Sequence, residues 1–163
     1  PVGTIFIPLA MLLLSPSFVV FGWAKPVPVN PSNLSSRKRD DILISMAGPA
    51  MNLILAFVLM CVLRILIELP PSISSSTIVE KIPQIALISL FLCFFNLIPI
   101  PPLDGSHVMR HVVGMSEEMY YSIAKWGFLI LIVVLNFIPF VGQAVYTISK
   151  ALLYFMLKLL LFP

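Results

Sequence analysis

Charged side chains are scarce in this sequence, and their scarcity excludes an ordinary water-soluble globule. Only 10% of the 163 residues are charged and 60% are hydrophobic, and the mean hydropathy is +1.06. So few polar side chains cannot cover the surface of a globular domain in water. We therefore expect an all-α, multi-pass integral membrane protein whose partner on most sides is the lipid bilayer.

Cysteine and basic clusters are also rare, which excludes two further classes of protein. Cys61 and Cys93 each lie alone inside an apolar run, so they are interpreted as small buried hydrophobes rather than a disulfide framework or a CxxC metal site. The formal net charge is only +3, and basic residues do not alternate with aromatics, so nucleic acid is not an expected partner. No internal repeat and no coiled-coil heptad is present, and the oligomeric state stays open.

Long apolar runs dominate what is present and predict a polytopic helical bundle of four to five apolar segments. Pro8 and Pro16 interrupt the first segment, which is therefore either a kinked span or a re-entrant element. The fifth segment carries Lys150 and Lys158 near one helical face, and it either crosses the membrane or lies along its surface. The segments cover approximately residues 4–22, 42–67, 82–98, 122–138 and 143–162.

Turn residues separate the last two segments. The sequence "PFVG" follows residue 138, and Pro139 and Gly142 predict a turn there. In the second segment, Arg64 lies near one end, where its long side chain can reach the membrane surface.

The distribution of positive charge predicts the orientation. The connection of residues 24–41 is polar, proline-rich and basic, whereas the Ser-rich residues 70–77 carry no such excess. The positive-inside rule then places the first connection in the cytoplasm and the second outside. The third segment consequently runs inward and delivers Asp104 to the cytoplasmic side.

The stretch "NLIPIPPLDG", from Asn96 to Gly105, ends this third segment on an acid. Its three prolines predict an unwound backbone, which is tolerated at membrane depth only where protein or water surrounds it. Asn96 and Asp104 at its two ends indicate a hydrated polar site. The alternative is that Asp104 simply caps a helix that begins near Ser106.

Three sequence blocks resemble those of a known family, in the same order and at plausible spacing. "FNLIPIPPLDGSHV" closely resembles the signature of the site-2 protease family of intramembrane zinc metalloproteases, and "FGWAKPVPVNP" and "ISMAGPAMNLILA" resemble two further blocks of its bacterial members. The resemblance extends over nearly the whole chain, from "PVGT" to the last apolar helices. It implies a bacterial cell-membrane enzyme whose substrate is a membrane protein or peptide with a transmembrane helix.

The resemblance also implies roles for particular residues. In the family, two histidines of an HExxH helix and the aspartate of the LDG block hold Zn²⁺, and the glutamate of HExxH is the general base. Asp104 matches the metal-binding aspartate, and Asn96 matches an asparagine with a catalytic role in positioning substrate or polarising its carbonyl. Three protein ligands leave zinc a fourth position for water.

One motif of the family is missing, because no HExxH occurs in the 163 residues. His107 and His111 are the only histidines and stand four apart, but Val108 occupies the place of the glutamate. We expect the motif to lie upstream of Pro1, so that residues 1–163 form the C-terminal majority of a single membrane-embedded peptidase domain. This chain alone is expected to be inactive.

The two histidines have two further interpretations. Asp104, His107 and His111 are spaced three and four apart, so on a helix they share a face and could form a metal site of their own. Alternatively, both histidines are polar anchors at the membrane interface, next to Arg110.

"SMAGPAMN" is interpreted as a packing element. Gly48, with alanines on either side of the Gly-Pro pair, lets helices approach closely, and Pro49 frees a carbonyl near Ser45 for a neighbouring group. Asn52 is then a buried amide that needs a partner, which is either a packing neighbour or the catalytic helix.

"GWAKPVPVNP" has two interpretations at the cytoplasmic mouth. It is either an extended strand that pairs with an unwound substrate segment or a rigid interfacial linker anchored by Trp23 and Lys25. Two rival functions also stay open: a non-catalytic relative that binds membrane helices, and a transporter or channel, although no inverted repeat is visible.

Overall fold

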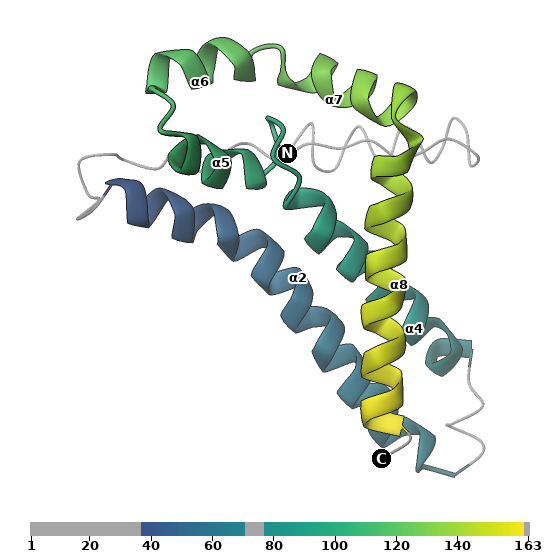
Figure 1. Cartoon of the computed structure of the whole chain (residues 1–163). Helices are drawn as coiled ribbons and strands as arrows, with labels where there is room; N and C mark the ends of the chain where they lie inside the picture. Colours follow the sequence, from purple (N-terminus) through teal and green to yellow (C-terminus); the bar gives the residue numbers. More distant parts are fainter. Residues whose placement is uncertain (1–36, 71–76, 162–163) are drawn as a thin grey trace, which may run out of the picture. The chain divides into compact units, whose positions relative to one another are not determined.

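Six α-helices and no β-strand make up the part of the chain that the computed structural model describes, residues 37–70 and 77–161 (Figure 1). These residues belong to one compact unit, residues 36–163. The all-helical prediction is confirmed. The predictions for the first apolar segment and for the proline-rich block of residues 21–31 lie outside the described residues. The helices are α2 Arg37–Ile67, α4 Thr77–Asn96, α5 Gly105–Val113, α6 Glu117–Ala124, α7 Gly127–Phe137 and α8 Pro139–Leu161.

The three long helices α2, α4 and α8 pack against one another through apolar side chains (Figure 1). Alanines at the contact let the backbones approach, and Leu and Met fill the remaining space. One hydrogen bond crosses the same interface, from Ser89 Oγ on α4 to the carbonyl oxygen of Asn52 on α2, at 2.8 Å. The buried cluster consists of Ala56, Met60, Leu63, Val79, Ile82, Ala86, Leu90, Leu153 and Met156.

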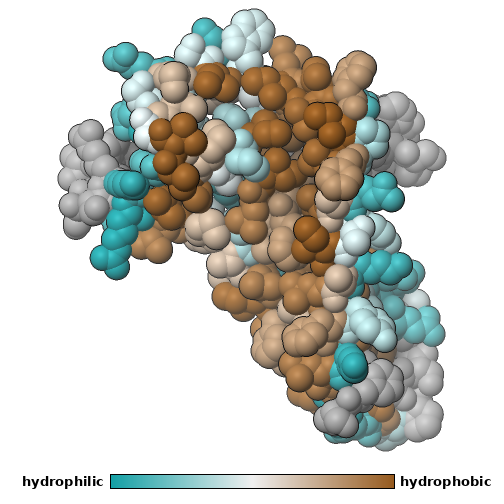
Figure 2. All heavy atoms as spheres, in the orientation of Figure 1, coloured by the Kyte–Doolittle hydropathy of each residue, from teal (hydrophilic) through white to brown (hydrophobic). Residues whose placement is uncertain are grey.

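These three helices are also long and apolar enough to cross a membrane. The candidate spans are Lys38–Ile67, Val79–Asn96 and Pro139–Leu160, and the bent pair α6 and α7 would be a fourth. Many large apolar side chains on these helices are exposed rather than packed, and Figure 2 shows hydrophobic atoms over much of the visible face. Such a surface is stable in lipid and not in water.

Three helices begin earlier than the sequence predicted, and one of them is α4, which starts at Thr77 instead of residue 82. α2 starts at Arg37 instead of residue 42, because residues 37–41 contain no helix breaker and simply extend the helix beyond its apolar part. α8 starts at Pro139, so the predicted turn at Pro139 and Gly142 is wrong. Proline suits the first position of a helix, where its missing N–H would have had no partner.

The predicted fourth segment, residues 122–138, is broken into two helices, a break that the sequence did not predict. α6 and α7 are bent by 59° at a break of two residues. α7 begins where it meets the proline turn, residues 97–104: a Cβ on Gly127 would lie 2.5 Å from the carbonyl oxygen of Pro101. This tertiary contact, which no local pattern reveals, determines where α7 starts.

Candidate metal centre around Asp104

A tight turn of residues 97–104 joins α4 to α5 and positions the candidate site. α4 ends at Asn96, and the amides of Leu97 and Ile98 close the last turn on carbonyls three residues earlier, at 3.2 and 3.1 Å. The prolines that follow cannot continue this pattern, so the predicted unwound stretch is confirmed. The chain then folds back so closely that a Cβ on Gly105 would overlap the carbonyl oxygen of Leu97. Only glycine fits at this position.

Asp104 lies at the end of this turn, directly before α5, and it does not cap that helix. Its backbone is already helical, with φ −57° and ψ −36°, and its side chain accepts no capping hydrogen bond. An N-cap residue normally has extended backbone angles that bring its side chain over the first amides. The capping interpretation of Asp104 is therefore wrong, and its carboxylate is available to bind another group.

The carboxylate of Asp104 instead lies against α2. A Cβ on Gly48 would be 2.9 Å from Asp104 Oδ2, so the missing side chain of Gly48 makes the space that the carboxylate occupies. Partial burial there raises the pKa of the Asp104 carboxyl, and the nearby His107 opposes this by lowering it. A half-buried acid with no hydrogen bond from the described residues is destabilised as an anion until a cation or donor reaches it.

Asn96 stands at the other end of the same turn. It is half-buried at the last position of α4, and its side-chain amide makes no hydrogen bond within residues 37–70 and 77–161. An amide in this position is free to bind a substrate carbonyl or a water molecule. Its catalytic role stays a prediction.

The two histidines of α5 face a different carboxylate, Asp41 of α2. His111 Nε2 lies 2.7 Å from Asp41 Oδ2, and His107 Nδ1 lies 3.3 Å from Asp41 Oδ1. Among the described residues, no three His, Cys, Asp or Glu side chains are grouped to hold a metal ion. The separate metal site of Asp104 with both histidines is therefore not formed, and the histidines tie α5 to the start of α2.

Sequence reasoning missed Asp41, although a signal for it exists. The charged run at residues 37–41 was interpreted as part of a loop, so Asp41 was not placed on a helix face. With α2 extended, Asp41, Ser45, Gly48 and Asn52 recur at intervals of three and four residues, as one face of a helix requires. This face meets α5 at its first part and α4 further along.

A buried polar network on the other side of α5 was also missed. Ser106 is fully buried; its hydroxyl oxygen lies 2.6 Å from the carbonyl oxygen of Leu103, to which it donates, and 2.9 Å from the hydroxyl of Tyr120 on α6. Arg110 is 8% exposed, pairs with Glu117 at 2.8 Å and lies over the ring of Tyr120. These bonds fix the rotation of α5 and hence the direction of the residues at its start.

The predicted packing residues of α2 occupy three different environments. Gly48 makes room for Asp104, as described above, and Pro49 is fully buried. Asn52 contributes its backbone carbonyl to the bond with Ser89, while its side-chain amide is half-buried. Whether the Asn52 amide binds a further helix stays a prediction.

An apolar groove of about 370 Å³ lies beside this turn, between α2 and α5. Its walls are almost entirely hydrocarbon, so it suits an apolar side chain or a lipid tail rather than a charged group. The lining residues are Met46, Leu97, Pro99, Gly105, Val108, Met109 and Val112.

The described residues fit one part of a zinc centre. Asp104 offers a carboxylate oxygen that neither caps its helix nor pairs with a described cation, and Gly48 leaves room around it. Carboxylate oxygen is an accepted zinc ligand beside imidazole nitrogen. Both histidines are engaged by Asp41, so imidazole ligands for the same ion are not present in this part of the chain.

Comparisons with known proteins agree with the motifs. Residues 66–138, which include the whole proline turn, match the family model described as Peptidase family M50. The chain is 35% identical over 118 residues to "Putative zinc metalloprotease YwhC" of Bacillus subtilis, covering 69% of this chain and 53% of that protein. It is 31% identical over 98 residues to "Putative zinc metalloprotease Rip2" of Mycolicibacterium smegmatis, covering 60% of this chain and 36% of that protein. The chain thus spans about half or less of these relatives, and no solved structure matches it significantly.

Proposed function

Because this chain belongs to Peptidase family M50, the site-2 protease family, and is a multi-pass membrane protein, we propose that it is part of an intramembrane zinc metalloendopeptidase. The intact enzyme cleaves membrane-protein substrates in or near a transmembrane segment. This chain contributes Asp104 as the carboxylate ligand of Zn²⁺. The HExxH helix must come from sequence other than these 163 residues, so the chain alone is inactive.

One observation carries this proposal: Asp104 is half-buried and stacked on Gly48, yet its side chain does not cap α5. Leaving an acid in such a place is costly unless a cation compensates it. The turn, the glycine at position 105 and the polar network beneath α5 together hold the carboxylate in this position.

When bound, zinc supplies Lewis-acid polarisation of the scissile carbonyl and a water of lowered pKa. The residues of this chain would bind the ion and orient the substrate. Asp104 would hold the ion through its carboxylate, and Gly48 keeps the space beside that carboxylate open. Asn96 donates a hydrogen bond from its amide to the substrate backbone, and the apolar groove beside Gly105 takes an apolar substrate side chain.

The orientation belongs to the same proposal. The basic residues at the start of α2 favour the cytoplasmic side, and Asp41 joins this end of α2 to α5. Asp104, directly before α5, therefore faces a cavity open to the cytoplasm of a bacterial cell. There it is within reach of water, which hydrolysis requires.

The experiment uses the complete protein expressed from its full coding sequence. Asp104→Ala should lose bound zinc, measured by metal analysis of the purified protein, and should lose cleavage of a transmembrane reporter substrate. Glu118→Gln is the matched control, because Glu118 is an exposed acid on the neighbouring helix α6. If the Asp104→Ala variant held as much zinc as the unmodified protein, Asp104 would not be a ligand of the ion.

A second candidate function rests on the missing motif. Without HExxH and without a three-ligand group among the described residues, the chain also fits a non-catalytic relative that binds membrane helices. The complete coding sequence distinguishes the two. An in-frame HExxH in an apolar helix supports the protease, whereas an intact reading frame without it supports the binding protein.

A further inference from the structure

One face of α8 carries six polar side chains between residues 143 and 158, although the helix is largely apolar. Its residues recur at intervals of three, four and seven, so at about 100° per residue they fall within roughly 120° of the helix circumference. All of them are exposed, including Tyr146 at 47% and Tyr154 at 70%. The polar stripe consists of Gln143, Tyr146, Thr147, Lys150, Tyr154 and Lys158.

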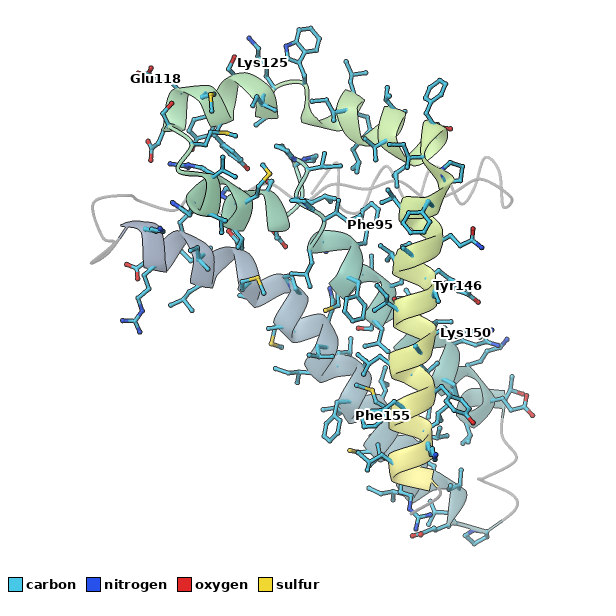
Figure 3. All side chains as sticks on the ribbon, in the orientation of Figure 1. Phe95, Glu118, Lys125, Tyr146, Lys150 and Phe155 are labelled. Carbon is cyan, nitrogen blue, oxygen red and sulfur yellow. The ribbon has the colours of Figure 1, made fainter. Side chains whose placement is uncertain are left out.

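This polar stripe is exposed and lies beside the buried side of α8. The buried side of α8 lies about a third of a turn around the helix from the centre of the stripe, and there Leu153 and Met156 join the apolar cluster of α2 and α4. Figure 3 shows Tyr146 and Lys150 one above the other on the same side of α8, and in Figure 2 a broken row of pale and teal side chains follows this helix. The stripe is therefore not used in packing the described helices.

Lys150 lies at the middle of the span. It is flanked by eleven residues on each side in the 23-residue helix Pro139–Leu161, so it is about 16 Å from either end. Half of the hydrocarbon thickness is about 15 Å, which is much longer than the four-carbon stem of a lysine. Snorkelling to the membrane surface, which suits Lys158 near the helix end, is therefore not available to Lys150.

No acid of this chain is placed to neutralise Lys150. The lysine makes no hydrogen bond or ion pair with the described residues. The first apolar segment, residues 4–22, contains no Asp or Glu. The seven acidic residues are Asp40, Asp41, Glu68, Glu80, Asp104, Glu117 and Glu118, and each lies outside the apolar segments or at the end of a helix. A second copy of the chain has the same acids, so it supplies none at this depth either.

We propose that the polar stripe of α8 is a docking surface for a transmembrane helix that carries an aspartate or glutamate near the middle of the membrane. In lipid, a carboxylate and an ammonium attract strongly because the medium screens little. Tyr146 and Tyr154 lie one turn to either side of Lys150, so their rings flank the ion pair and their hydroxyls hydrogen-bond the partner. The surface is separate from Asp104, and this inference stands whether or not the chain acts in proteolysis.

The test measures association by energy transfer between the labelled full chain and labelled synthetic helices in phosphatidylcholine vesicles. Three helices of about 20 leucine and alanine residues carry Glu, Gln or Lys at the centre. The Glu helix should bind roughly tenfold more tightly than the Gln helix, and the Lys helix should not bind above background. Equal binding of all three helices would overturn the proposal.

Substitutions in the chain test whether Lys150 causes the preference for the Glu helix. Lys150→Met should abolish the preference for the Glu helix, and Lys150→Glu should transfer the preference to the Lys helix. Lys158→Met, a matched change on the same stripe near the helix end, should leave the preference in place. A preference that survives Lys150→Met, or self-association of the chain that excludes the Glu helix, contradicts the proposal. Helix content by circular dichroism confirms that each variant is folded.

Discussion

Nine buried apolar residues form the core of the contact among α2, α4 and α8, whereas polar side chains hold α5 against α2 and α6. In the first region, any well-packed apolar side chain of similar volume would serve, because lipid and Leu are chemically alike. In the second, Asp41, Ser106 and Arg110 each meet a particular partner at bonding distance. The difference teaches that the long helices make a scaffold, whereas the short helices specify a geometry.

The proline turn lies between these regions and tolerates the least change. Its prolines end α4, and its glycine at position 105 lets the chain fold back on Leu97. The carboxylate of Asp104 lies directly beside this contact. Breaking the turn should therefore displace α5 and its polar contacts first and leave the contact of α2 with α4 in place.

The largest effect is expected from Gly105→Ala. The new Cβ would overlap the carbonyl oxygen of Leu97, so the turn must open, at a cost of about 3 kcal/mol in the free energy of unfolding. Reversible unfolding in mixed micelles measures this cost. Gly142→Ala is the matched control, because its Cβ meets nothing within 4 Å and the change should stabilise α8 by about 0.5 kcal/mol. Equal stability of the two variants would show that the turn is not tight.

A smaller effect is expected from Leu90→Ala in the apolar region. Leu90 is fully buried between the long helices, and its truncation leaves a cavity. Because a lipid environment removes much of the transfer contribution, we expect a loss of about 2 kcal/mol in the free energy of unfolding. Leu92→Ala, at a position 43% exposed on the same helix, should cost far less. Zinc content of the complete protein should not change in either variant, unlike in Asp104→Ala.

The smallest effect on stability is expected from Asp41→Asn, which weakens both histidine contacts while keeping the side-chain volume. We expect a loss of about 1.5 kcal/mol, typical of hydrogen bonds to a charged group. Amide hydrogen exchange should rise in α5 and not in the contact of α2 with α4. Glu118→Gln, an exposed change of the same kind, should leave exchange in α5 unaltered. If the amides of α5 exchanged equally fast in Asp41→Asn and in the unmodified protein, Asp41 would not hold α5 in place.

Much of the scaffold and part of the site were predictable from the sequence. The apolar runs predicted the three long helices, and the prolines after Asn96 predicted the unwound turn, because both effects are local. The start of α8 was predicted wrongly, since proline both ends and begins helices. The break between α6 and α7 was missed because it depends on a contact between Gly127 and Pro101, which are far apart in the chain.

The sequence by itself determined the membrane class, the long helices and the identity of the candidate ligand, because hydropathy, proline geometry and a short motif are properties of neighbouring residues. Only the tertiary structure decided that Asp104 rests on Gly48 instead of capping α5, that both histidines turn to Asp41, and that Lys150 remains on an open face. Each of these depends on which helix faces cross one another. That crossing follows from packing of the whole unit and cannot be deduced from the periodicity of any one helix.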